Sequence, residues 1–136
     1  MKIKKIIAGV CAAAISVSAL AASVGAGTDS KSVTISSITA NMSLSVTSKQ
    51  VIGMASLGAN PLDYDILEAR VTINFYTRNN TDGYTITEHA GGKWVTGGCG
   101  CNGFPQEGFS IISANSRYDF RINGNNHYGY TLSALA

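Results

Sequence analysis

The chain has 136 residues, with 10 basic and 8 acidic side chains, 15 glycines and 3 cysteines. Three of the basic residues lie within the first five positions, so residues 27–136 carry seven basic against eight acidic side chains, a net charge of 7 − 8 = −1. This balance predicts no basic patch and argues against electrostatic binding to nucleic acid or to an anionic membrane. The many glycine, serine and threonine residues are typical of a loop-rich, all-β protein, and 110 residues (136 − 26) are enough for one domain with its own core.

The N-terminus has the three parts of a secretory signal peptide. The basic start MKIKK is followed by an uncharged apolar run, Ile6 to Leu20, and then by small residues that permit cleavage after Ala21 or after Ala26, of which we favour the second. An uncleaved membrane anchor is the alternative, because the stretch from Ile6 to Gly27 is long enough to cross a bilayer, which takes about 20 residues. We therefore expect residues 1–26 to form a signal-peptide helix and residues 27–136 to form one secreted domain.

Alternation of apolar and polar residues predicts the first strands, because successive side chains of an extended chain point to opposite faces. After a polar lead-in, Gly27 to Lys31, the alternation runs from Ser32 to Thr47, with a break expected near Asn41. Val51 to Leu57 is either a third strand or the continuation of the second.

The longest alternation is LEARVTINFYTR, Leu67 to Arg78. It predicts a long strand with one face in the core and one face in solvent. The residues expected to face the core are Leu67, Ala69, Val71, Ile73, Phe75 and Thr77, and those expected to face solvent are Glu68, Arg70, Thr72, Asn74, Tyr76 and Arg78.

Turn signals divide the rest of the chain. Asp82-Gly83 predicts a hairpin to a return strand that Gly91-Gly92 ends, and Asn123-Gly124 predicts a second hairpin near the C-terminus. Five glycines and a proline in Gly97 to Gly108 exclude a central strand and indicate a surface loop. Seven or eight short strands with regular turns predict an antiparallel β-sandwich, immunoglobulin-like or jelly-roll-like, with a small barrel as the alternative.

Cys99-Gly100-Cys101 is the most unusual chemical feature of the sequence. An internal disulfide is expected in an exported protein, since the third cysteine lies in the signal peptide, although a one-residue gap makes a strained ring. Alternatives are a soft-metal site completed by His89 or His127, an intermolecular disulfide, free thiols, and a cysteine nucleophile with a histidine base.

Three acidic residues, Asp63, Asp65 and Glu68, lie at the entry to the long strand. Oxygen ligands at such a strand mouth suit calcium, but the twelve-residue calcium-loop pattern is absent. A solvated sheet edge is the competing interpretation, and no cofactor is expected.

Aromatic residues are the better indication of a binding surface, because exposed rings stack on sugars or anchor protein interfaces. Tyr and Trp are also ordinary core residues of a sandwich, and either role is open for each of them. The candidate ligand contacts are Tyr76, Trp94, Phe104, Tyr128 and Tyr130.

The KIKKII start, the small-residue cleavage zone and the single domain rich in Thr, Ser and Tyr resemble small exported proteins of Gram-positive bacteria, with lactococcin 972-like bacteriocins as the nearest named comparison. The resemblance implies a bacteriocin-like effector. The single Trp and the Cys-Gly-Cys stretch depart from that family. From the residues themselves we expect a secreted, non-enzymatic protein that binds a cell-surface component, a glycan or another protein, and no nucleic acid.

Overall fold

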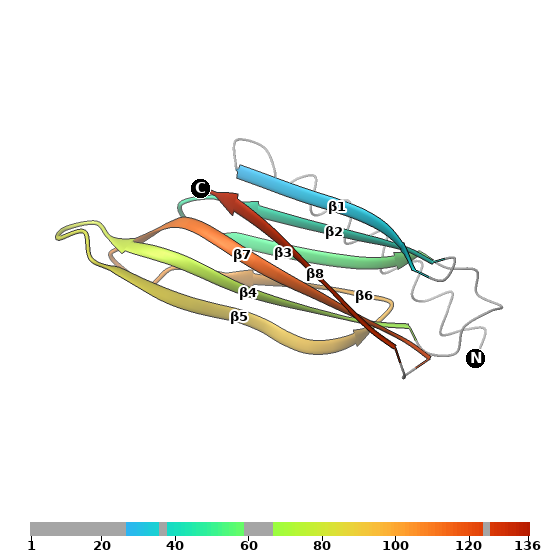
Figure 1. Ribbon diagram of the computed structural model, residues 1–136. Helices are drawn as coiled ribbons and strands as arrows, with labels where there is room; N and C mark the ends of the chain where they lie inside the picture. The colour runs from blue at the N-terminus through green and yellow to red at the C-terminus, as the bar shows by residue number, and fades with distance from the viewer. Residues whose placement is uncertain (1–26, 36–37, 59–66, 124–125) are drawn as a thin grey trace.

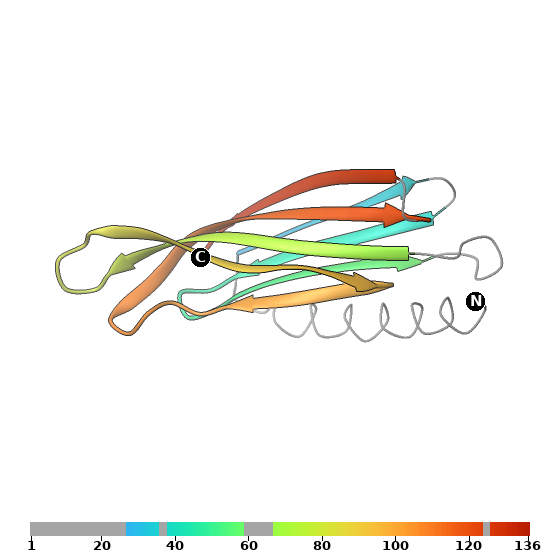
Figure 2. The ribbon, with the colours of Figure 1, turned by 90° about the horizontal axis from the view of Figure 1, so that it is seen from below.

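The computed structural model describes residues 27–35, 38–58, 67–123 and 126–136, apart from the side chains of 126–128. These residues form two four-stranded antiparallel sheets packed face to face (Figures 1 and 2). The first sheet has the order β1-β2-β3-β6, with β1 (Gly27–Ile35), β2 (Ile38–Val46), β3 (Val51–Gly58) and β6 (Gly98–Gly103). The second has the order β5-β4-β7-β8, with β5 (Thr85–Thr96), β4 (Leu67–Asn79), β7 (Phe109–Ile122) and β8 (Asn126–Leu135). The predicted all-β antiparallel sandwich is confirmed, while the signal peptide and its cleavage sites lie outside the described residues.

Strand β4 is central to the second sheet, and its predicted faces are confirmed. Its odd-numbered residues from Leu67 to Thr77 are buried, and its even-numbered residues are half-buried or exposed. The core between the sheets is built largely from aliphatic residues, with Phe75, Tyr118 and Phe120 as its largest side chains. The Tyr118 hydroxyl donates to the Ser43 carbonyl oxygen at 2.6 Å, so one hydrogen bond joins the two sheets through the core.

The N-terminal strands differ from the prediction in their limits. β1 begins at Gly27, in the segment expected to be a polar lead-in, and the break falls between Ile35 and Ile38. Asn41, where the break was expected, lies within β2 and pairs with Ser32. The expectation was wrong because Asn41 simply continues the alternation, exposed between two buried neighbours.

The prediction of a loop from Gly97 to Gly108 was also wrong for its first half, because Gly98–Gly103 forms strand β6. β6 is an edge strand that pairs with β3 alone in the first sheet. At Gly103 a Cβ atom would lie 2.5 Å from the Phe75 ring, so glycine here permits close packing between the sheets. Glycine at this position therefore marks close packing of a side chain against the backbone of a strand.

Gly91 and Gly92 do not end β5 as expected. The strand continues to Thr96 through an irregularity in its pairing with β4, where Arg70 pairs with Trp94 but Thr72 pairs with Gly91. Both glycines have positive φ, 86° and 107°, which accommodates the extra residues of a β-bulge. The bulge bends the edge of the second sheet opposite Val71.

The long sides of the sandwich are joined by hydrogen bonds between the sheets. On one side the Ser133 amide of β8 donates to Oδ2 of Asp29 in β1 at 3.2 Å. On the other, the chain crosses from β5 to β6 at Gly97, whose amide donates to the Leu67 carbonyl and whose carbonyl accepts from the Leu57 amide, at 2.7 and 3.0 Å. The turn between β4 and β5 projects at one end of the molecule (Figure 1).

Candidate functional site

All four arginines of the chain lie on the outer face of the second sheet. Arg70 and Arg78 occupy outward positions of β4, and Arg117 and Arg121 occupy outward positions of the adjacent strand β7. We call this surface the arginine face; its other side chains include Glu68, Thr72, Asn74, Tyr76, His89, Trp94, Asn115 and Asp119. The sequence predicted no basic patch, but the fold gathers four of the seven basic side chains of residues 27–136 on one sheet face.

Asp119 organises the centre of the arginine face. Its Oδ1 accepts from Nε of Arg117 at 2.9 Å, and its Oδ2 accepts from Nη2 of Arg70 at 3.1 Å. The Asp119 side chain is only 1% exposed, whereas those of Arg70 and Arg117 are 31% and 57% exposed. A carboxylate covered in this way fixes both guanidinium groups while leaving part of each in solvent.

Gly129 provides the space for this ion-pair network. It lies opposite Asp119 on β8, and a Cβ atom there would lie 2.5 Å from Nη2 of Arg117 and 3.2 Å from Oδ1 of Asp119. The absence of a side chain at this position lets the arginine and the aspartate lie across the edge strand.

Trp94 lies on the arginine face and not in the core. The guanidinium carbons of Arg70 and Arg121 lie 4.5 and 4.1 Å from its ring centroid, so the indole packs against two cations. Arg121 also lies 3.9 Å from Glu68. The Trp94 ring therefore helps to position both arginines, and its predicted contact with a ligand stays a prediction.

A shallow cavity of about 340 Å³ lies in the middle of the arginine face. Guanidinium, amide, carboxylate and hydroxyl groups line most of it: Arg70, Thr72, Asn74, Asn115, Ser116, Arg117, Asp119 and Thr131. Tyr76 is half-buried beyond it on β4, with its hydroxyl accepting from Nδ2 of Asn115 at 3.4 Å. Of the predicted aromatic candidates, the structure thus brings Tyr76 and Trp94 to one surface, on either side of a polar cavity.

The other candidates lie elsewhere. Phe104 is 60% exposed in the loop that follows β6, and Tyr130 is half-buried against the core, with its ring 6.2 Å from that of Phe120. The side chain of Tyr128 is outside the part of the structure that is described. So are Asp63 and Asp65 of the predicted calcium site, while Glu68 lies beside Arg121.

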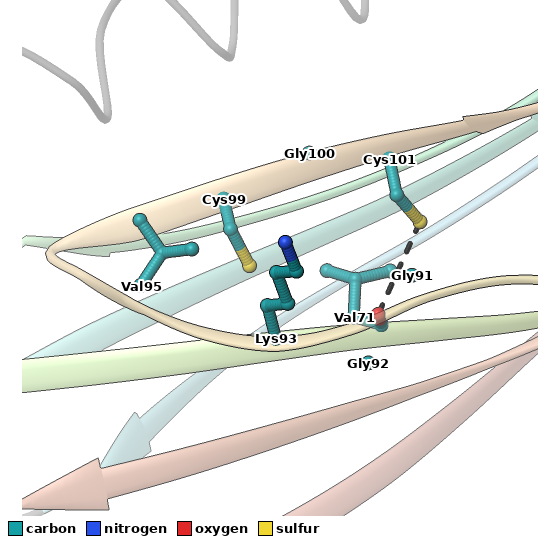
Figure 3. Close-up of a pocket in the computed structure, with 8 residues that line it drawn as sticks. All are labelled: Val71, Gly91, Gly92, Lys93, Val95, Cys99, Gly100 and Cys101. Carbon is teal, nitrogen blue, oxygen red and sulfur yellow. Dashed lines mark hydrogen bonds between the residues drawn. The ribbon is translucent and has the colours of Figure 1, made fainter.

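Cys99 and Cys101 are free thiols in the structure, in contrast to the expected disulfide. They occupy alternate positions of β6, where an extended backbone separates the Cα atoms by about 6.5 Å, near the upper limit for a disulfide. Both side chains point from β6 toward β4 and β5 (Figure 3). They line a second cavity, of about 320 Å³, with Val71, Gly91, Gly92, Lys93, Val95 and Gly100.

Both thiols are protonated at neutral pH. Burial raises the pKa of Cys99 to about 11 and that of Cys101 to about 12. His89 cannot act as their base, because it lies on the arginine face, where its Nδ1 contacts Oδ1 of Asn74. Thiols with raised pKa values are poor nucleophiles, so the geometry gives no support to a cysteine–histidine enzyme that uses His89.

These pKa values predict a loss of stability in alkali. The unfolded thiols have a pKa near 9.0, so between pH 9 and about 11 the unfolded chain loses protons that the folded chain keeps, and stability falls as the pH rises. The limiting slope is about 1.4 kcal/mol per pH unit for each thiol, and we expect about 1 kcal/mol per unit in total because the cavity opens to solvent. Urea unfolding of a Cys11→Ser protein should show this slope between about pH 9 and 10, below the range in which the buried Tyr118 hydroxyl, whose pKa is also raised, adds to it. Adding Cys99→Ser and Cys101→Ser should remove most of the slope in that range. An unchanged slope would contradict the burial of the thiols.

No protein-family model matches the chain, no curated protein matches its sequence, and no solved structure matches its fold. Within the described ranges, no helix is long and apolar enough to cross a membrane.

Proposed function

We propose that the protein is a secreted, non-enzymatic binding protein that attaches to an acidic polysaccharide of a cell surface through the arginine face. The observation that carries the proposal is that all four arginines lie on one sheet face, where Arg70 and Arg117 line a polar cavity. The signal-peptide pattern of residues 1–26 supports export.

Charge favours an anionic ligand. The four arginines, Glu68 and Asp119 give the arginine face a net charge of 4 − 2 = +2, against −1 for residues 27–136 as a whole. Guanidinium groups bind carboxylate, sulfate and phosphate groups through paired N–H donors. A negatively charged ligand would therefore be attracted to this face in preference to the rest of the domain.

The site is preorganised. Asp119 fixes Arg70 and Arg117 from below, and Trp94 packs against Arg70 and Arg121. Side chains that are already ordered lose little conformational entropy on binding, which raises affinity.

The shape favours an extended polymer. Arg70 and Tyr76 are six residues apart on β4, which places them about 20 Å apart along the strand. The amides of Asn74 and Asn115 lie between them, beside or within the cavity, and could bond to hydroxyl groups. A chain of several sugar units would contact the whole length of the face.

Binding should depend on the arginines and on ionic strength. We expect immobilised carboxylated or sulfated polysaccharides to retain the protein at low salt and to release it as salt screens the charges. Arg117→Glu and Arg78→Glu should each weaken binding by at least about tenfold, the effect of losing one hydrogen bond to a charged group. Equilibrium binding to acidic and neutral polysaccharides of matched length measures the difference.

Lys49→Glu is the matched control, because it makes the same charge change at an exposed position between β2 and β3 of the first sheet. Gly129→Ala tests preorganisation separately, since its methyl group would displace the Arg117 guanidinium without removing charge. Wild-type binding by both arginine variants, or equal retention by neutral polysaccharides, would overturn the proposal.

A further inference from the structure

We propose that Cys99 and Cys101 form a two-coordinate site for a soft monovalent metal ion, with Cu(I) as the ion that fits the ligand set. The site is separate from the arginine face: it lies at the edge where β6 faces the bulge of β5, and it does not depend on the proposed binding function.

The strand geometry points the two sulfur atoms to the same side. Residues at alternate positions of a strand share a face, and Figure 3 shows both side chains of β6 directed toward Val71. Rotation about χ1 lets the sulfurs approach each other. An ion bound between them needs a sulfur–sulfur separation of about 4.6 Å, twice a metal–sulfur bond of about 2.3 Å. Two cysteines whose Cα atoms are about 6.5 Å apart reach this separation more easily than the much shorter sulfur–sulfur bond of a disulfide.

The bulge in β5 leaves room for an ion. A Cβ atom on Gly91 would lie 2.8 Å from Sγ of Cys101 and 2.2 Å from the Val71 carbonyl oxygen, so a side chain there would fill the space beside the sulfur. With glycine at 91 and 92, the thiols face a cavity of about 320 Å³ that opens to solvent.

The ligand set selects the ion. Thiolates favour soft ions such as Cu(I) and Zn(II). Zinc requires four ligands, and no group of three or more His, Cys, Asp or Glu side chains suited to a metal occurs among the described residues. A monovalent d¹⁰ ion is satisfied by two sulfurs in a line.

Lys93 offsets the negative charge that forms when the ion binds. Binding follows 2 RSH + Cu⁺ → [RS–Cu–SR]⁻ + 2 H⁺, with no change in oxidation state. The product carries one negative charge, and the Lys93 ammonium, whose side chain lines the same cavity and points toward β6 (Figure 3), offsets it. Because two protons leave for each ion that binds, the affinity for the metal should rise with pH.

The test is anaerobic titration of the reduced Cys11→Ser protein with Cu(I) against a chromogenic Cu(I) chelator. We expect one ion per chain, two protons released per ion, and thiolate-to-copper absorption in the ultraviolet. Cys99→Ser and Cys101→Ser should each abolish retention against the chelator, and Lys93→Ala should weaken it by about tenfold or less.

Ser113→Ala serves as the control, since it changes a half-buried residue of β7 outside the cavity. Circular dichroism establishes that each variant is folded. The proposal is overturned if the folded protein does not retain Cu(I), if either single-cysteine variant retains it like the parent, or if two chains share one ion.

Discussion

Replacing Phe75 with alanine should lower the free energy of unfolding by about 3 to 5 kcal/mol, the cost of removing a large aromatic side chain from a packed core. Phe75 is 2% exposed at the centre of β4. Its ring packs against Gly103 of β6, so its loss would leave a cavity between the sheets, where the glycine has no side chain to fill it. Urea unfolding followed by circular dichroism measures the change.

The neighbouring residue provides the control. Tyr76 follows Phe75 on the same strand but points to the arginine face, and Tyr76→Ala should cost less than about 1 kcal/mol. If Phe75→Ala does not fold, Phe75→Leu should still fold and cost about 1 kcal/mol or slightly more. Equal costs at positions 75 and 76 would mean that the faces of β4 are assigned incorrectly.

Replacing Asp119 with alanine should cost about 2 to 3 kcal/mol. Removing one partner from a buried ion pair costs 3 to 5 kcal/mol, but Arg70 and Arg117 remain partly in solvent and can recover some hydration. The same variant should weaken binding of an acidic polysaccharide even though it adds positive charge to the arginine face, because the two guanidinium groups lose their fixed positions. Thermal unfolding and polysaccharide binding measure the two effects.

Glu68→Ala is the matched comparison for Asp119→Ala. It also removes one negative charge from the arginine face, but Glu68 is 24% exposed and lies 3.9 Å from Arg121. A surface ion pair of this kind contributes less than about 1 kcal/mol. Similar losses in the free energy of unfolding for the two variants would show that Asp119 is not the centre of the ion-pair network. Tighter polysaccharide binding by Asp119→Ala than by the unmodified protein would show that net charge matters more than the positions of the arginines.

The sequence predicts the parts of the fold that depend on local alternation. The two-residue period is strict over the twelve residues from Leu67 to Arg78, whose faces are as expected, and β4 continues for one residue more, to Asn79. Strand β6 and the bulge in β5 were missed because glycine occurs both in loops and at special positions within strands, and the sequence pattern does not distinguish the two. Gly103 makes room for Phe75, and Gly91 takes a positive φ within a continuing strand, whereas glycine clusters predict loops.

The candidate site could be predicted only in part, for a different reason. Alternation indicates that Arg70 and Arg78 of one strand, and Arg121 of another, face away from the core. It does not indicate that β7 pairs with β4, because 29 residues (108 − 79) separate the end of one from the start of the other, and within them the chain visits the opposite sheet. The arginine face arises from that long-range pairing, as does the burial of Asp119, which in sequence is an ordinary polar position.

The hydrogen bonds along the long sides of the sandwich also affect how the protein behaves when concentrated. Open edge strands present unpaired amide and carbonyl groups, and other chains can add to them to form aggregates or fibres. Here Asp29 caps an amide of β8, and Gly97 ties the β5 side to the first sheet. These contacts hold the outer strands against the opposite sheet and occupy some of the groups through which another chain could add. Such cover would help the proposed binding protein to stay dispersed when many copies attach to one polymer.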